Sequence, residues 1–268
     1  MAIRRKARFW LTLFGIDIRK FKASIADFPA YRRDRAELKK QAKTSTNTFP
    51  FSKSYPCLAE RNVDSGAASG HYFHQDLLVA REIFKRAPER HVDIGSRIDG
   101  FVAHVACFRE IEVFDIRPLP AKVPNISFVQ ADLMSPLDSR LVEYCDSLSC
   151  LHALEHFGLG RYGDQVNFDG HILGLNNLYK ILKPRGRLYL SVPIGKQRIE
   201  FNAHRVFSIA YLLELLEGKF TIEKFSYVND KGDLVEDVDV HSEPASNNFH
   251  CKYGCGIFEL VKLPETCD

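Results

Sequence analysis

The sequence contains no long hydrophobic run and no ordered set of cysteines. No uninterrupted apolar stretch reaches the roughly 18 residues that a membrane-spanning helix needs, so we expect no such span. Its seven cysteines are scattered and do not follow the spacing of a disulfide framework. A chain of 268 residues has room for a sizeable core and does not depend on disulfides to fold. This cysteine usage favours a reducing compartment and predicts a cytoplasmic protein.

Charge is nearly balanced over the chain, with 37 Lys or Arg against 34 Asp or Glu, but it is unevenly placed. Residues 1–43 hold 13 Lys or Arg and only 4 Asp or Glu. We therefore divide the chain into a basic helical N-terminal arm with a linker, 1–60, and a main domain, 61–268. Helices are predicted over 2–15 and 32–43, with a polar linker over 44–56.

Two interpretations of the arm stay open. It makes a peripheral contact with the inner face of the membrane or with a partner, or its first helix packs onto the main domain. No element that reads bases accompanies the positive charge, so nucleic acid is not an expected partner.

Strands and helices alternate through the main domain. Such an order predicts an α/β fold, a Rossmann-like doubly wound and mostly parallel sheet of seven strands. The last two strands have no helix between them, so the last strand is expected to be antiparallel. The predicted strands are 91–94, 111–114, 126–130, 147–151, 187–192, 220–227 and 256–262.

Polar residues and glycines follow the predicted strands, at the edge where ligands bind in doubly wound sheets. Asp115 at the end of the second strand suits both hydroxyls of a ribose, and Asp132 follows the third. The remaining residues of this set are Asp93, Gly95, Ser96 and Gly100 around the first strand, and His152, Glu155 and His156 after the fourth.

Four stretches resemble the class I S-adenosylmethionine-dependent methyltransferases. "HVDIGSRIDG" (91–100) is similar to their first motif, "VFDI" (113–116) to their ribose-acid strand and "QADLM" (130–134) to their adenine-side turn. "LYKILKPRGRLYLSVP" (178–193) resembles their late helix, turn and strand. "GHYFHQDLLVAREI", "FNAHRVFS" and "CKYGCGIFEL" resemble an uncharacterised branch associated with bacterial surface-polysaccharide synthesis.

The resemblance implies S-adenosylmethionine as cofactor and S-adenosylhomocysteine as product. It places Gly95 and Ser96 by the methionine part, Asp115 by the ribose and Asp132 near the adenine. Asp93 and Gly100 belong to the same cofactor motif, and Tyr72 and Gln75 are expected to help close the site. Arg97 stands where the family usually has glycine. Its side chain either pairs with the cofactor carboxylate, points outward or blocks the cofactor.

The expected reaction is O-methylation of a sugar, nucleotide-sugar or glycan precursor, which needs a base to take the hydroxyl proton. His156, His204 and His152 are the candidate bases, because histidine accepts a proton near neutral pH. The alternative is that these histidines only satisfy backbone groups of their loops. Arg205 is the candidate contact for an anionic acceptor.

Two stretches contain residue types that bind metals. "HALEH" (152–156) fits H-x-x-E-H, but that zinc motif requires a long helix and here follows a strand. His250, Cys251 and Cys255 match no paired zinc spacing, so no metal ligand is predicted.

Two other functions remain open. One is a catalytically silent methyltransferase-like protein that binds or scaffolds partners in glycan assembly. The other is a dinucleotide-dependent oxidoreductase, because Asp115 would serve NAD equally well.

Overall fold

The computed structural model describes residues 11–12, 14–47 and 49–264, so most of the helix predicted over 2–15 lies outside the described residues. The chain forms two compact units, the first ending at Ala67 and the second beginning at Ala68. No helix in the described ranges is long and apolar enough to cross a membrane.

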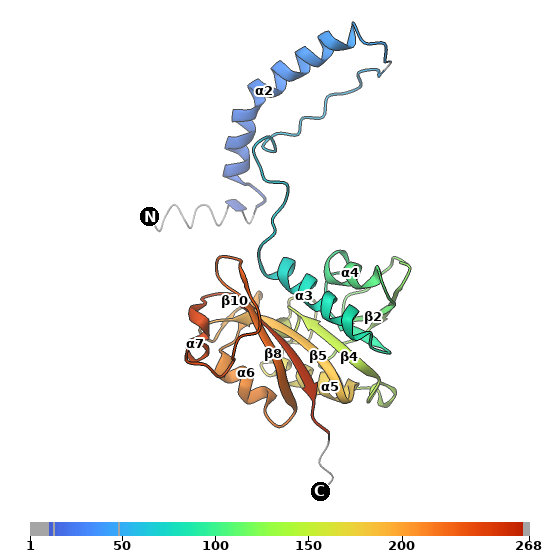
Figure 1. Ribbon diagram of the computed structural model, residues 1–268, viewed down its shortest axis with the longest axis vertical. Helices are drawn as coiled ribbons and strands as arrows, with labels where there is room; N and C mark the ends of the chain where they lie inside the picture. Colours follow the sequence, from blue (N-terminus) through green and yellow to red (C-terminus); the bar gives the residue numbers. More distant parts are fainter. Residues whose placement is uncertain (1–10, 13, 48, 265–268) are drawn as a thin grey trace. The chain divides into compact units, whose positions relative to one another are not determined.

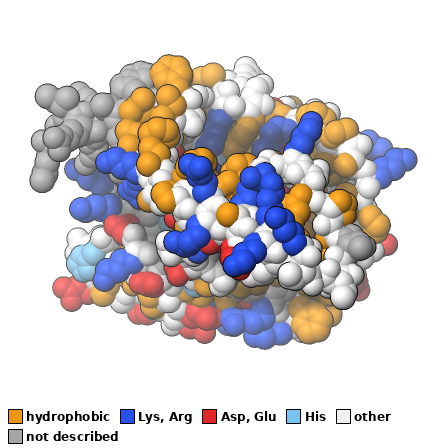
Figure 2. Space-filling view, turned by 90° about the horizontal axis from the view of Figure 1, so that it is seen from above, with side chains coloured by type: hydrophobic (Ala, Val, Ile, Leu, Met, Phe, Trp, Pro, Cys, Tyr) orange, Lys and Arg blue, Asp and Glu red, His pale blue; other side chains and the backbone are white. Residues whose placement is uncertain are grey.

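The first unit is built around one helix, α2 (Ile18–Ala42). The Asp17 side chain caps it by accepting hydrogen bonds from the backbone N–H groups of Arg19 and Lys20. The helix predicted over 32–43 was too short at its start, since α2 begins at Ile18 and continues through Pro29. Basic and hydrophobic side chains are both exposed on α2, the hydrophobic ones including Phe21, Ile25 and Phe28. Figure 2 shows basic and hydrophobic side chains intermingled on one face of the molecule.

An eight-stranded sheet forms the centre of the second unit, in the order β3-β2-β1-β4-β5-β10-β8-β9 (Figure 1). Neighbouring strands from β3 to β5 pair in parallel, and β10 is antiparallel to both β5 and β8. The predicted Rossmann-like fold with an antiparallel last strand is confirmed. The strands are β1 (His91–Ile94), β2 (Ile111–Asp115), β3 (Ile126–Gln130), β4 (Cys145–Leu151), β5 (Leu182–Ile194), β8 (Phe220–Val228), β9 (Leu234–Val235) and β10 (Gly254–Lys262).

Helices cover both faces of this sheet. On one face, α3 (His71–Arg86) and α4 (Ala103–Ala106) enclose a core with Ile83, Val105 and Val113. On the other, α5 (Gly170–Ile181) and α6 (Ile209–Leu216) enclose a larger core with Leu178 and Leu212. Burying both faces leaves the strand ends as the accessible part of a parallel sheet.

Several boundaries differ from the sequence prediction. An aspartate before an apolar run predicts a helix capped by Asp76, but α3 begins at His71 and Asp76 lies buried inside it. The sequence also predicts a short helix over 138–144, where the structure has only a 3-10 turn, Ser139–Leu141. A hairpin of β6 (Arg198–Glu200) and β7 (His204–Val206), the short α7 (Glu243–Ser246) and the eighth strand β9 were not predicted. These elements have two to four residues, too few for a periodic pattern to show.

Candidate active site

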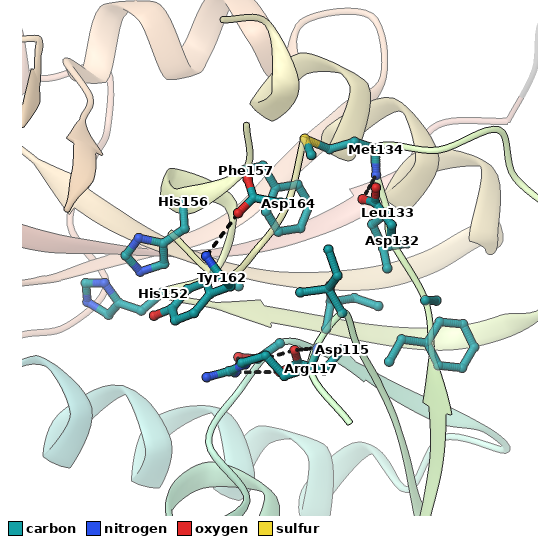
Figure 3. A pocket seen from close by; sticks show the side chains of 16 residues that line it. Asp115, Arg117, Asp132, Leu133, Met134, His152, His156, Phe157, Tyr162 and Asp164 are labelled. Carbon is teal, nitrogen blue, oxygen red and sulfur yellow. Dashed lines mark hydrogen bonds and ion pairs between the residues drawn. The ribbon is translucent and has the colours of Figure 1, made fainter. Parts of the chain in front are cut away.

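A cleft lies at the carboxyl ends of β1, β2, β3 and β4, where the strand order 3-2-1-4-5 changes direction. Its volume is about 60 Å³, which is small beside the roughly 300 Å³ at the lower end of ligand pockets. Figure 3 shows His152 and His156 toward one end, and Asp132 with Met134 toward the other. The lining residues are Ile94, Gly95, Phe114, Asp115, Ile116, Arg117, Ala131, Asp132, Leu133, Met134, His152, Ala153, His156, Phe157, Tyr162 and Asp164.

Gly95 is the first cleft residue after β1. Its φ of +71° lies in the left-handed region that favours glycine, and a Cβ added there would stand 3.0 Å from the Cβ of Ala153. The turns after β1 and β4 therefore approach closely at the cleft, and a larger residue at 95 would force them apart.

Asp93 and Ser96 shape this turn from beneath and do not line the cleft. The buried Asp93 carboxylate accepts hydrogen bonds from the Ser96 N–H (3.0 Å), the Ser96 hydroxyl (2.8 Å) and the Ser149 hydroxyl (2.5 Å). Burial raises the pKa of Asp93 to about 6 in spite of these donors. Since the Ser96 hydroxyl is committed to Asp93, it supports the turn and is not directed at a ligand.

Arg97 lies outside the cleft lining, and its side chain is 65% exposed. The guanidinium donates to the Asp99 carboxylate through Nε (3.0 Å) and Nη2 (2.8 Å). Of the orientations considered from the sequence, the structure therefore shows the outward one. The side chain does not block the cleft.

Gly100, Tyr72 and Gln75 also lie outside the lining. Gln75 is buried, accepting from the Ser191 hydroxyl (2.5 Å) and donating to Asp76 (3.1 Å). Tyr72 is half exposed, with its ring centroid 5.1 Å from that of His152. Tyr72 and Gln75 therefore flank the histidine end of the cleft.

Asp115 ends β2 at the cleft but already has a partner. Its carboxylate accepts from the Arg117 backbone N–H (2.8 Å), from Nε (3.0 Å) and from Nη2 (2.5 Å) (Figure 3). The same guanidinium lies 4.5 Å from the centroid of the Tyr162 ring. Arg117 and Tyr162 therefore narrow the cleft in front of Asp115.

Asp132 lies at the other end of the cleft, after β3. Its carboxylate accepts from the Met134 N–H (2.9 Å) and the Ser135 hydroxyl (3.2 Å), so it caps its own turn. Leu133 and Met134 extend an apolar wall beside it, with Phe114 also in the lining.

His156 contributes a directed imidazole to the cleft. Its Nδ1 lies 2.7 Å from the carbonyl oxygen of Ala203 and therefore carries the proton. Its Nε2, left as the acceptor, is 3.8 Å from Glu155 Oε1. Burial lowers the pKa of His156 below its usual 6.5, so the ring is neutral at pH 7 and able to take a proton.

His152 is more deeply buried and more tightly bound, with Nδ1 2.7 Å from Glu155 Oε1. Burial alone would lower its pKa, but the facing Cys255 and Glu155 raise that pKa well above 6.5. A ring that keeps its proton at pH 7 is unsuited to act as a base, so of the two cleft histidines His156 fits that role better.

His204 and Arg205 do not line the cleft. His204 stands on β7, where its Nε2 is 3.3 Å from Glu200 Oε2. Arg205 was predicted to meet an anionic acceptor, but it is only 4% exposed. It donates to backbone carbonyls, among them those of Phe157 (2.5 Å) and Phe168 (2.8 Å). The prediction for Arg205 is corrected: the side chain binds the two ends of one loop together.

The loop that Arg205 holds carries residues that sequence reasoning missed. Asp164 accepts from the backbone N–H groups of Gly158 (2.9 Å), Gly160 (3.1 Å) and Tyr162 (3.1 Å). This places Tyr162 over the cleft, with its ring 5.4 Å from that of His156. Closely spaced glycines before an aspartate were the available signal, since such loops fold around a carboxylate.

Comparison with known proteins places the chain near an uncharacterised family and a well-populated fold. The family model described as "Caenorhabditis protein of unknown function, DUF268" matches residues 126–252. No curated protein matches the chain in sequence.

Three of the similar solved structures illustrate the fold. The N-methyltransferase NodS from Bradyrhizobium japonicum WM9, in complex with S-adenosylhomocysteine, is 14% identical, with 73% of this chain and 89% of that chain covered and a TM-score of 0.48. The 1,6-didemethyltoxoflavin-N1-methyltransferase of Burkholderia thailandensis is 17% identical, with 71% and 79% covered and a TM-score of 0.48. A putative sarcosine dimethylglycine methyltransferase from Galdieria sulphuraria is 14% identical, with 71% and 85% covered and a TM-score of 0.49. With identities of 14–17% and TM-scores below 0.5, these similarities carry no conclusion about the activity or substrate of the chain.

Proposed function

We propose that this chain is an S-adenosylmethionine-dependent methyltransferase that methylates an oxygen of a sugar, nucleotide-sugar or glycan precursor. The observation that carries the proposal is the position of Asp115. Its carboxylate faces the same cleft as Gly95, Asp132 and the neutral His156, at the point where doubly wound sheets bind nucleotides.

The cleft residues fit an adenosyl group in their order along the sheet edge. The Asp115 carboxylate would accept hydrogen bonds from the two ribose hydroxyls in place of those it now accepts from the Arg117 guanidinium. Phe114, Leu133 and Met134 offer an apolar surface for the base, and Asp132 stands at the polar end of that wall. Gly95 leaves backbone room at the end nearest the histidines. The bound cofactor supplies an electrophilic methyl group.

His156 is the proposed base. Its Nε2 would take the proton of the acceptor hydroxyl, while the Ala203 carbonyl holds Nδ1–H in place. The methyl group would pass from the cofactor sulfur to the acceptor oxygen, and S-adenosylhomocysteine would leave. Glu155, 3.8 Å from Nε2, stabilises the imidazolium that results. The choice of a sugar-containing acceptor rests on the sequence resemblance.

Binding and turnover are tested separately. Isothermal titration with S-adenosylmethionine and S-adenosylhomocysteine should show one site per chain. Transfer of a labelled methyl group to a panel of nucleotide sugars and glycan fragments should then fall by about 10²–10⁴-fold in His156→Gln with cofactor binding kept. His204→Gln, outside the cleft lining, is the matched control. Unchanged turnover in His156→Gln would remove His156 as the base.

The narrowness of the cleft favours a second candidate function. A volume of about 60 Å³, with Arg117 already bound to Asp115, is what a methyltransferase-like protein that has lost its cofactor would also show. Such a protein would bind or scaffold partners in glycan assembly. Failure of both cofactors to bind at millimolar concentration would favour this candidate over the enzyme.

A further inference from the structure

Three residues from distant parts of the sequence meet beside the histidine end of the cleft. His71 is the first residue of α3, His152 follows β4 and Cys255 lies on β10. One potential ligand atom of each lies within 4.8 Å of the other two. No other group of three or more His, Cys, Asp or Glu with this property occurs in the described part of the chain.

His152 directs an unused nitrogen into this group. Its side chain is 3% exposed, Glu155 occupies Nδ1 at 2.7 Å, and the buried Nε2 has no hydrogen-bond partner. A buried polar atom without a partner costs free energy, so its persistence calls for an explanation. The residue also has φ of +51°, a left-handed conformation that non-glycine residues rarely adopt.

The other two residues are held differently. Cys255 is fully buried on β10, where it pairs with Pro193 of β5 and Val228 of β8. His71 is partly exposed at the start of its helix, with its ring nearly parallel to that of His152 at 5.1 Å and the Tyr253 ring 5.3 Å away. The positions of His152 and Cys255 are therefore fixed by the sheet, whereas the His71 side chain is able to move.

We propose that His71, His152 and Cys255 bind a zinc ion, which displaces the protons of His152 Nε2 and of the Cys255 thiol. Two imidazoles and a thiolate are a donor set that suits zinc. With bond lengths of about 2.0–2.3 Å, the donors of a tetrahedral zinc lie roughly 3.3–3.8 Å apart. The three donors lie within 4.8 Å of one another and would close to that spacing on binding, with the partly exposed His71 free to move toward the other two. The Glu155 carboxylate on Nδ1 is the partner that zinc-binding histidines typically have, because it fixes the tautomer and the ring orientation.

Three protein ligands leave a fourth zinc position for water or for a substrate oxygen, as in catalytic zinc sites. Because His152 lines the cleft as well, this position adjoins the space in which the acceptor would react. The zinc proposal does not depend on cofactor binding, and each is measured without the other.

The first experiment uses the full chain, stripped with a chelator and titrated with Co²⁺ as a spectroscopic substitute for zinc. The expected result is one equivalent bound, a thiolate-to-cobalt charge-transfer band in the near ultraviolet and the visible bands of a four-coordinate ion, all removed by Zn²⁺. Cobalt binding without the charge-transfer band would overturn the proposal, as would preference for Cu²⁺ with no zinc affinity.

Variants test the individual ligands. Cys255→Ser should abolish the charge-transfer band, whereas Cys251→Ser, a second buried cysteine nearby, should keep it. His71→Ala should lower zinc affinity by about 100-fold or more, and Glu155→Gln by about 10–100-fold. His74→Ala, on the same helix, should bind zinc like the wild type. If circular dichroism shows that Cys255→Ser does not fold, the proposal is tested with His71→Ala, because His71 is partly exposed. Wild-type zinc affinity in His71→Ala would contradict the proposed site.

Discussion

Replacing Asp115 with alanine is the most direct test of the cleft as a nucleoside site, and the chain contains a matched control. Asp138 and Arg140 repeat the pairing of Asp115 and Arg117 two residues apart. In both pairs the backbone N–H donates to the carboxylate, at 2.8 and 2.9 Å, and Nη2 does so at 2.5 Å. Asp138, however, does not line the cleft. Only Asp115→Ala should therefore affect a ligand bound there.

The expected magnitude follows from the bonds exchanged. Two ribose hydroxyls donating to a carboxylate contribute about 1.5–3 kcal/mol each, together about 3–6 kcal/mol. Binding must first displace Arg117, whose side chain is 43% exposed, so that its ion pair is worth about 1 kcal/mol or less. The net loss in Asp115→Ala is then about 2–5 kcal/mol, a weakening of roughly 30-fold to several thousand-fold.

The assay is isothermal titration of S-adenosylhomocysteine into the wild type and three variants. Asp138→Ala should bind within about twofold of the wild type, because an exposed pair outside the cleft contributes little. Arg117→Ala should bind up to about fivefold more tightly, because removing the competitor returns about 1 kcal/mol. Wild-type affinity in Asp115→Ala would refute the ribose role. Weaker binding in Arg117→Ala would show that Arg117 holds the ligand instead of competing with it.

Three further predictions concern stability and the arm. Burial lowers the pKa of His91 to about 3, so between pH 6.5 and 3 only the unfolded chain binds a proton at this residue. The free energy of unfolding should therefore fall by about 1.4 kcal/mol per pH unit on acidification. Unfolding free energies measured with urea at several pH values should depend less steeply on pH in His91→Gln. Arg205→Lys should lose about 2–4 kcal/mol of stability in urea, because an ammonium group cannot donate to both carbonyl oxygens that the guanidinium reaches. Arg198→Lys, the control, should lose little. In flotation with anionic liposomes, Phe21→Glu combined with Ile25→Glu should release the full chain, whereas Tyr55→Glu, an exposed aromatic outside α2, should not; equal flotation of all three proteins would contradict a membrane role for α2.

The sheet was predictable because buried parallel strands and their helices repeat over windows long enough to carry a pattern. Strands β1 to β3 match their predicted ranges to within one residue. The first residues of helices were less predictable where the preference of a single residue opposes that of its neighbours. The helix predicted from position 32 in fact begins at Ile18, and Asp76, a residue type that favours helix caps, lies inside α3. In both places neighbouring residues outweighed the local preference.

Sequence alone determined which residues stand at the strand ends, because strand order and carboxyl-end placement follow from the alternation of elements. Gly95, Asp115, Asp132 and His156 were identified in this way, and all line one cleft. Sequence could not give side-chain direction, since each direction depends on partners elsewhere. Arg97 turns to Asp99, and Arg205 is consumed by backbone carbonyls.

The group of His71, His152 and Cys255 is the clearest product of the tertiary structure. Its members are separated by 81 and 103 positions in the sequence, so no motif spacing indicates them. They meet because α3 begins beside the end of β4 and β10 returns antiparallel to the neighbouring β5. A ligand set assembled across three elements exists only after the sheet has formed. The sequence therefore determined the fold and the cleft residues, whereas the packing of strands and helices decided which residues meet beside the cleft.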